Sequence, residues 1–136
     1  MSSPTDEHKA DAPASLQCAV VTVSDSRTLE TDTGGQLVVD LLSAAGHVVV
    51  CREIIPDDPD RMTPLLQSWR DGDEVAAVLM TGGTGITSRD QTYETVTQLI
   101  TRPLPGYGEL FRMLSYEQVG PAAMLSRATA GLMHQT

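Results

Sequence analysis

The sequence is poor in aromatic residues and in the ligand patterns of zinc sites. Aromatic side chains make up 4% of the 136 residues, so a core must be built from aliphatic side chains and methionine. The two cysteines, Cys18 and Cys51, form no C-x-x-C pair, and the three histidines are scattered. This spacing argues against the common zinc sites and predicts two buried free thiols in a reducing compartment.

Long apolar runs and basic character are absent as well. No segment approaches the ~18 apolar residues that a membrane span needs, and the N-terminus lacks the apolar region of a signal peptide. The formal net charge is −9, and an acidic field disfavours nucleic acid and anionic lipid as partners. We therefore expect a cytoplasmic protein whose anionic ligands need a local cradle of backbone amides, cations or Mg²⁺.

One folded domain is expected. Residues 1–15 are polar and aperiodic, which is typical of a disordered tail. Residues 16–136 are enough for one hydrophobic core. Short apolar runs at residues 16–23, 47–55 and 75–80 predict three buried strands.

The segment after the first strand predicts an amphipathic helix. Thr33 and Gln36 resemble a capping box, with Thr33 as the N-cap. Gly46 is expected to end the helix. The apolar spacing predicts a buried face made of Leu37, Val38, Leu41, Leu42 and Ala45.

Later segments predict further helices. Asp58 is a suitable N-cap and Pro59 suits the first helical position. The inward face of this second helix is expected to contain Met62, Leu65, Leu66 and Trp69. Three more helices are expected at residues 92–101, 107–117 and 121–130. The methionines at 62, 113, 124 and 133 are expected to fill the core.

The alternation of strands and helices predicts a three-layer α-β-α fold with a mostly parallel, doubly wound sheet. In such α/β folds, ligands bind outside the carboxyl ends of the strands. Polar or glycine-rich loops follow all three strands, at residues 24–27, 56–58 and 81–90. The sequence therefore places a candidate site at this edge.

The glycine-rich loop is the most informative of the three. Its glycines, Gly82, Gly83 and Gly85, allow the backbone to approach an anion closely and to present consecutive amides to it. No Lys-Ser or Lys-Thr follows, so the loop is not a Walker A motif, and Ser88 replaces the third glycine of a dinucleotide fingerprint. Taken alone, the loop is equally compatible with a plain turn.

Several ordered motifs resemble the MogA/MoaB family, which includes molybdopterin adenylyltransferases and the G domain of gephyrin. The most specific is the Thr-Gly-Gly-Thr-Gly segment at residues 81–85, followed after four residues by Asp90. The other matching segments lie at residues 23–27, 32–34, 55–57, 89–92, 104–112 and 120–128. The resemblance extends from about Ala19 to Gly131.

The resemblance implies a function and a set of site residues. Family enzymes transfer AMP from ATP to molybdopterin with Mg²⁺ and release pyrophosphate. It implies that Asp57 and Asp90 are the catalytic and metal-binding residues. The implied binding residues are Ser24, Asp25, Thr81, Gly82, Gly83, Thr84, Gly85, Glu109, Ser115 and Ser126. It also implies a homotrimer or a trimer-based hexamer.

This residue set suits the implied chemistry. The attacking phosphate monoester is already anionic, so no strong base is needed, and the barrier lies in bringing two anions together. Carboxylates can hold Mg²⁺ through one or two contacts while waters and phosphates complete its shell. We therefore assign Asp57 and Asp90 to the placement of metal and substrate.

Simpler interpretations stay open for each residue. Asp57 is also interpretable as a turn or capping residue beside Pro56, and Asp90 as an anion at a helix start. Asp25 is also compatible with closing a turn and Glu109 with a solvated charge. Ser115 and Ser126 are also compatible with ordinary helix-surface positions.

The sequence departs from the family pattern in two places. Family members usually continue with one more apolar strand, a loop and a last helix, so the resemblance implies that a C-terminal strand and helix are missing here. Tyr93 stands where the family often has proline, which only preorganises a helix start. A molybdopterin-binding MoaB-like paralogue with little catalytic activity is the alternative function. A general phosphate-binding module is a third.

Overall fold

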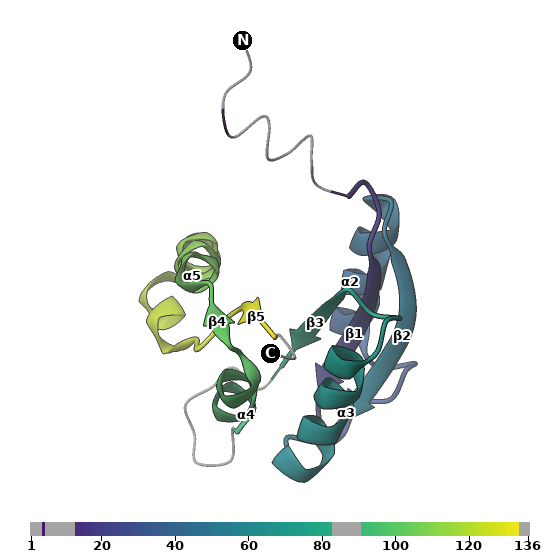
Figure 1. Cartoon of the computed structure of the whole chain (residues 1–136). Helices are drawn as coiled ribbons and strands as arrows, with labels where there is room; N and C mark the ends of the chain where they lie inside the picture. Colours follow the sequence, from purple (N-terminus) through teal and green to yellow (C-terminus); the bar gives the residue numbers. More distant parts are fainter. Residues whose placement is uncertain (1–3, 5–12, 83–90, 134–136) are drawn as a thin grey trace.

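The computed structural model describes residues 4, 13–82 and 91–133. Three parallel strands form its central sheet in the order β2-β1-β3 (Figure 1). They are β1 (Gln17–Val23), β2 (Val48–Ile55) and β3 (Ala77–Thr81). The expected strands are confirmed to within two residues at each end. The middle strand is the most apolar and is buried from Cys18 to Val23.

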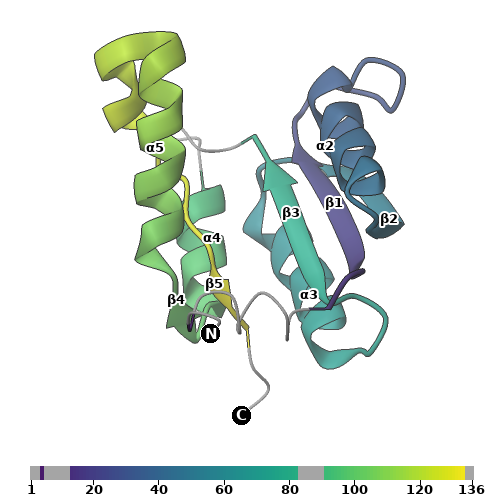
Figure 2. The same ribbon diagram turned by 90° about the horizontal axis from the view of Figure 1, so that it is seen from above.

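Two helices connect the strands and cover the sheet. α2 (Thr33–Ala44) and α3 (Pro59–Asp71) lie on opposite faces, as Figure 2 shows. Val21 and Val23 pack with Met62 and Leu66 of α3. Thr22, between them in sequence, bonds instead to the residue that caps α2. This alternation follows from the two-residue period of a strand. It confirms the doubly wound, three-layer α/β fold.

The start of α2 differs from the expectation. Asp32, not Thr33, is the N-cap, and its Oδ1 accepts a hydrogen bond from the amide of Gly35 at 3.0 Å. The side chain of Gln36 does not reach back to a cap but extends to Asp40 and to the guanidinium of Arg52. The expected capping box is therefore wrong, because partners on two strands hold the Asp32 carboxylate at the cap position.

The buried face of α2 is also narrower than expected. Val38 and Leu42 are half-buried, whereas Leu37 is 57% and Leu41 62% exposed, and Ala45 is exposed too. One stripe of a helix is enough to cover this three-stranded sheet, and the neighbouring leucines lie beside that stripe. The C-terminal end agrees with the expectation, since Gly46 follows the cap with φ of +93°.

The cap of α3 is confirmed. The Asp58 side chain accepts from the amide of Asp60 at 2.9 Å, and Pro59 begins the helix. Met62 is fully buried, as expected. The expectation that Met113 and Met124 fill the core is wrong, because they are 57% and 78% exposed.

The rest of the described chain forms a second group of elements. These are α4 (Thr92–Leu99), β4 (Arg102–Pro103), α5 (Pro105–Val119), the 3₁₀ helix η1 (Gly120–Leu125) and β5 (Gly131–Leu132). β4 and β5 pair in the antiparallel direction, which joins the segment before α5 to the segment after η1.

The expected helix at residues 121–130 is wrong in its second half. It is a 3₁₀ turn followed by an extended segment. The amides of Thr101 and Leu104 donate to the carbonyls of Leu132 and Ala130 at 2.8 Å each, so pairing with a distant segment replaces the local helix.

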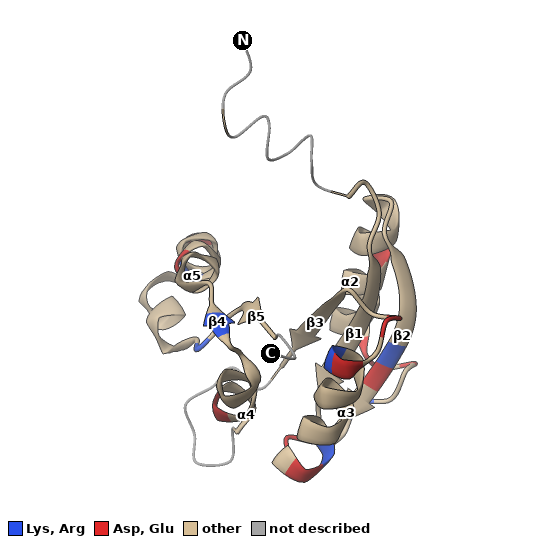
Figure 3. Cartoon of the chain, viewed as in Figure 1, with Lys and Arg blue, Asp and Glu red and all other residues tan. Residues whose placement is uncertain are grey.

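Charged residues are dispersed over this fold. Figure 3 shows acidic and basic residues interspersed along β2 and α3. None of the helices in the described ranges is both long and apolar enough to cross a lipid bilayer.

Candidate functional site

The ends of the three parallel strands meet at one edge of the sheet. The amide of Ser24, just after β1, donates to the carbonyl of Ile55 at the end of β2, at 2.8 Å. On the other side, Gly82 follows β3 with φ of +90°, and a Cβ there would lie 2.5 Å from the Val23 carbonyl oxygen. Only glycine permits both this conformation and this approach. The structure thus brings together the predicted residues Ser24, Thr81 and Gly82.

The loop after β1 is a tight turn. The Ser24 hydroxyl oxygen accepts from the amides of Ser26 at 3.2 Å and Arg27 at 3.0 Å. The Arg27 guanidinium donates to the Thr31 carbonyl at 2.9 Å. Asp25 lies exposed at the tip of this turn. The Ser24 side chain therefore shapes the loop that presents Asp25 at the edge of the sheet.

Asp57 joins the end of β2 to the start of α4. Both oxygens of its carboxylate accept from the amide of Gln91, at 3.1 Å each, and Oδ1 also accepts from the Thr92 hydroxyl at 3.1 Å. A carboxylate at a helix N-terminus satisfies unpaired amides and interacts favourably with the helix dipole. Asp57 is thus a capping residue, but for a helix that begins 35 residues later rather than for its own turn.

Four predicted site residues, Gly83, Thr84, Gly85 and Asp90, lie outside the described residues. The two residues that flank this stretch both make specific contacts. Gly82 packs on the end of β1, and the amide of Gln91 donates a hydrogen bond to the Asp57 carboxylate.

A second set of predicted residues lines a cavity of about 440 Å³ near the start of α5. Glu109 and Ser126 both line it. Arg112 donates from Nη1 to the carbonyls of Ser126 and Ala128, at 3.2 Å each, and so ties the segment after η1 to α5. Ser115 is half-buried on α5 and is not among the described residues that line this cavity or the next one.

Another cavity, mostly apolar and of similar volume, about 430 Å³, lies between β3 and the second group of elements. Thr81, Gly82 and Thr92 line it. The lining residues that it shares with the cavity near Glu109 are Tyr93, Arg127, Ala128 and Thr129, so the two cavities adjoin between the sheet edge and the Ser126 segment. Tyr93 and Arg127 were not among the site residues predicted from the sequence. The signal was available, because Tyr93 departs from the family pattern and Arg127 belongs to the matching Ser-Arg segment.

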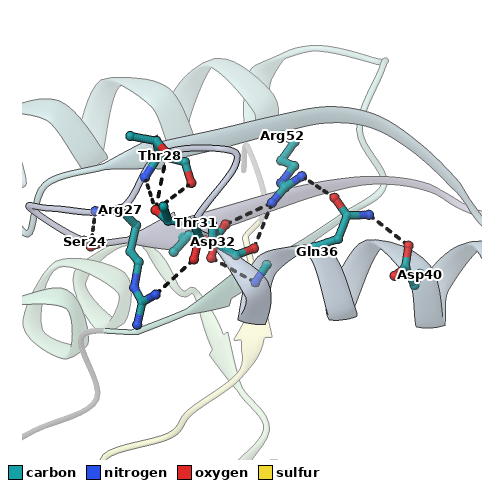
Figure 4. Close-up of polar contacts among 10 residues, drawn as sticks. Ser24, Arg27, Thr28, Thr31, Asp32, Gln36, Asp40 and Arg52 are labelled. Atoms are coloured by element: carbon teal, nitrogen blue, oxygen red, sulfur yellow. Dashed lines mark hydrogen bonds and ion pairs between the residues drawn. The ribbon is translucent and has the colours of Figure 1, made fainter.

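A buried ionic network lies beneath the first loop (Figure 4). Asp32 is only 4% exposed and accepts from Thr22 Oγ1 at 2.6 Å and from Arg52 Nη2 at 3.2 Å. Burial raises the pKa of Asp32, but hydrogen bonds from Thr22 and Gly35 and the charge of Arg52 outweigh burial, so its pKa is lowered overall. The network fixes the start of α2 to β1 and β2. The sequence feature that indicates this network is Arg52, a basic residue within the largely apolar strand β2.

The donor set for a metal ion is limited in the part of the chain that is described. There, no group of three or more His, Cys, Asp or Glu side chains is placed to hold an ion. Mg²⁺ requires only one or two carboxylates when phosphates and waters supply its other ligands. Asp57, at the strand ends, is compatible with that smaller role.

Comparisons with known proteins agree with this architecture. The family described as "Probable molybdopterin binding domain" matches residues 19–135. Molybdenum cofactor biosynthesis protein B of Bacillus subtilis (strain 168) is 47% identical over 131 residues, which cover 96% of this chain and 77% of that protein.

Solved structures give the same result. A crystal structure of a molybdenum cofactor biosynthesis protein B is 47% identical, with a TM-score of 0.84 over 90% of this chain and 77% of the other. The tungsten cofactor synthesizing protein MoaB from Pyrococcus furiosus is 38% identical, with a TM-score of 0.77 over 92% and 78% of the two chains. The chain belongs to the MogA/MoaB family of molybdopterin-binding domains and to molybdenum cofactor biosynthesis.

Proposed function

We propose that this protein adenylylates molybdopterin. An oxygen of the terminal phosphate of molybdopterin attacks the α-phosphorus of ATP. The bond between the α-phosphorus and the bridging oxygen breaks, and pyrophosphate leaves with the electron pair. The products are adenylyl-molybdopterin and pyrophosphate, and the proposed location is the cytoplasm.

The convergence of the three strand ends is the observation that carries this proposal. Ser24, Asp57 and Gly82 come from different loops and meet where α/β folds bind their ligands. Asp90 and the remaining glycines of the loop belong to the proposal through the family resemblance.

Mg²⁺ is the proposed cofactor, and it would disperse the negative charge of the reacting phosphates. Asp57 and Asp90 are the proposed ligands. Because the Asp57 carboxylate already accepts bonds from Gln91 and Thr92, its orientation is set before the metal arrives. The nucleophile is anionic, so the protein residues orient groups and exclude water rather than remove a proton.

A second function is favoured by a specific observation. The relatives at 41–50% identity are named molybdenum cofactor biosynthesis protein B, whereas the MogA structure is 23% identical and supports the fold alone. A binding protein for molybdopterin with little or no catalytic activity is therefore the alternative.

One experiment decides between the two. The purified chain is incubated with molybdopterin, ATP and Mg²⁺, and pyrophosphate and the AMP–molybdopterin product are measured. If the protein is the adenylyltransferase, the product should form, and it should be lost in the Asp57→Ala and Asp90→Ala variants and on removal of Mg²⁺. Folded protein that binds molybdopterin but forms no product would establish the binding protein. Binding of ATP without molybdopterin would favour a general phosphate-binding module.

We also propose that the chain assembles as a homotrimer or a trimer-based hexamer. Exposed apolar side chains are concentrated on α5, namely Tyr107, Leu110, Phe111, Met113 and Leu114. Each of these side chains is 40–60% exposed, and apolar patches of roughly 300–600 Å² are the largest on typical monomers and often serve for association. Sedimentation equilibrium should give a multiple of three chains, and a stable monomer would contradict the proposal.

A further inference from the structure

We propose that Thr92 is a positioning residue for Asp57, and that it leaves Oδ2 as the carboxylate oxygen that faces the ligands. The inference rests on the proposed function, in which Asp57 places metal and substrate, and it deepens that function. The family resemblance includes Thr92 in the matching segment 89–92 but gives it no role.

The two oxygens of the Asp57 carboxylate are not equally occupied. Oδ1 accepts from the Gln91 amide and from the Thr92 hydroxyl, at 3.1 Å each. Oδ2 shares the Gln91 amide at 3.1 Å and has no second donor among the described residues. Each oxygen of an ionised carboxylate offers about two acceptor positions. Oδ1 is therefore filled from within the protein, whereas Oδ2 keeps a position for a cation or for a donor on the substrate.

The bond from Thr92 to Asp57 is not needed to cap α4. The groups that a helix cap must satisfy are backbone amides, and the Gln91 amide already makes that contact with the carboxylate. The hydroxyl of Thr92 is a side-chain donor that the helix does not require to be paired with Asp57. Its bond to Oδ1 therefore fixes the orientation of the carboxylate rather than the start of the helix.

The other threonines of α4 show how a hydroxyl bonds in this helix without a distant partner. Thr95 and Thr97 donate to the carbonyls of Gln91 and Tyr93, at 2.8 Å each. Such a bond, four residues back, is a local pattern of threonine within helices. Thr92 begins α4, so the residue four positions earlier is not part of the helix, and its hydroxyl donates instead to a side chain beyond the end of β2.

Burial makes the bond from Thr92 persistent. Thr92 is only 6% exposed, and a buried donor that loses its acceptor pays the full cost of its lost hydration. Asp57 itself is half-buried, so its carboxylate is not enclosed on every side. Thr92 therefore holds Oδ1 from the protein side, and Oδ2 is the oxygen that a ligand can reach.

The test removes the hydroxyl and keeps the shape of the side chain. Thr92→Val retains the branched Cβ, whereas Thr92→Ser retains the hydroxyl. In the adenylylation assay, Thr92→Val should lower kcat about tenfold or more, because a hydrogen bond to a charged group is lost. The KM values for ATP and molybdopterin should change less than about threefold, since orientation matters most in the transition state. Thr92→Ser should restore kcat to within about threefold of the native value.

A second measurement needs neither metal nor substrate. Vicinal Hα–Hβ couplings in nuclear magnetic resonance spectra report the χ1 angle of Asp57, and in the native chain they should correspond to one rotamer. In Thr92→Val they should be averaged over several rotamers. The Gln91 amide should also exchange with solvent about threefold faster or more, because its acceptor is less well held. Both values should return to native in Thr92→Ser.

Thr97→Val is the matched control. It makes the same substitution in the same helix but removes bonds to backbone carbonyls only. Its kcat, its Asp57 couplings and its Gln91 exchange should therefore stay native. Equal losses in Thr97→Val and Thr92→Val would overturn the inference, because they would reflect a general loosening of α4. Circular dichroism verifies folding, and if Thr92→Val does not fold, Thr92→Ala, which also lacks the hydroxyl, takes its place.

The outcomes separate this inference from the proposed function. Native protein that forms product, with kcat lowered in Thr92→Val but not in Thr97→Val, supports both. Equal kcat in the native chain and Thr92→Val would overturn the inference and keep the proposed function. Native protein that forms no product would refute the proposed function, and the Asp57 couplings would then decide whether Thr92 orients the carboxylate.

Discussion

Replacement of Asp32 by asparagine should destabilise the protein by about 2–3 kcal/mol. Asparagine is as good an N-cap as aspartate, so the bond to the Gly35 amide survives. The charge that faces Arg52 does not. Breaking a buried ion pair from one side costs about 3–5 kcal/mol, and the expected value is lower because the Arg52 side chain is 18% exposed and regains some hydration. Asp32→Ala should cost about 4–5 kcal/mol, because it also removes the cap and leaves Thr22 without its acceptor.

A double-mutant cycle isolates the ionic term. Arg52→Met alone leaves a buried carboxylate without its cation, whereas Asp32→Asn with Arg52→Met removes both charges. The double variant should be more stable than the sum of the single effects predicts, by about 1–2 kcal/mol. Urea denaturation followed by far-ultraviolet circular dichroism measures each free energy of unfolding. Additive effects, or an Asp32→Asn variant within about 0.5 kcal/mol of the native chain, would refute the reasoning.

The pH dependence of the same variants provides an independent check. Because the pKa of Asp32 is lowered in the folded state, its contribution is fully present above the unfolded-state pKa, about 3.9. It is lost as the pH falls through the folded-state pKa. The stability difference between native and Asp32→Asn proteins should therefore be constant near neutral pH and shrink in acid. A difference that grows in acid would contradict this sign.

Three further predictions concern the site. Gly82→Ala should cost several kcal/mol of stability and weaken molybdopterin binding, because the new Cβ would lie 2.5 Å from the Val23 carbonyl oxygen. Thermal unfolding measures the stability and titration the binding. A variant as stable as the native chain would contradict this prediction. Asp57→Asn should keep most of the stability, since one oxygen still accepts from Gln91, whereas Asp57→Ala should lose about 1 kcal/mol; equal stabilities would dismiss the capping role. Arg112→Met should release the segment after η1 and raise amide hydrogen exchange there; unchanged protection would argue against it.

The sequence alone was sufficient where the determining forces are local. Short apolar runs bounded by polar loops predict buried strands, and the three strands lie within two residues of where those runs predicted them. The cap of α3 by Asp58 was also predictable, because a capping side chain bonds to amides two or three residues away. Family membership followed from ordered motifs, each of which is a local pattern.

Only the tertiary structure decided the contacts that cross the chain. Asp57 has a capping role at a helix 35 residues away, and Asp32 is an N-cap because Thr22 and Arg52 of two strands hold it. The residues after Leu125 were expected to continue a helix, but the carbonyls of Ala130 and Leu132 accept from the amides of Leu104 and Thr101, and the segment is extended. The juxtaposition of Tyr93 and Arg127 has the same origin. No local pattern encodes such partners, because side-chain hydrogen bonds and stacking depend on where distant segments lie after the sheet has formed.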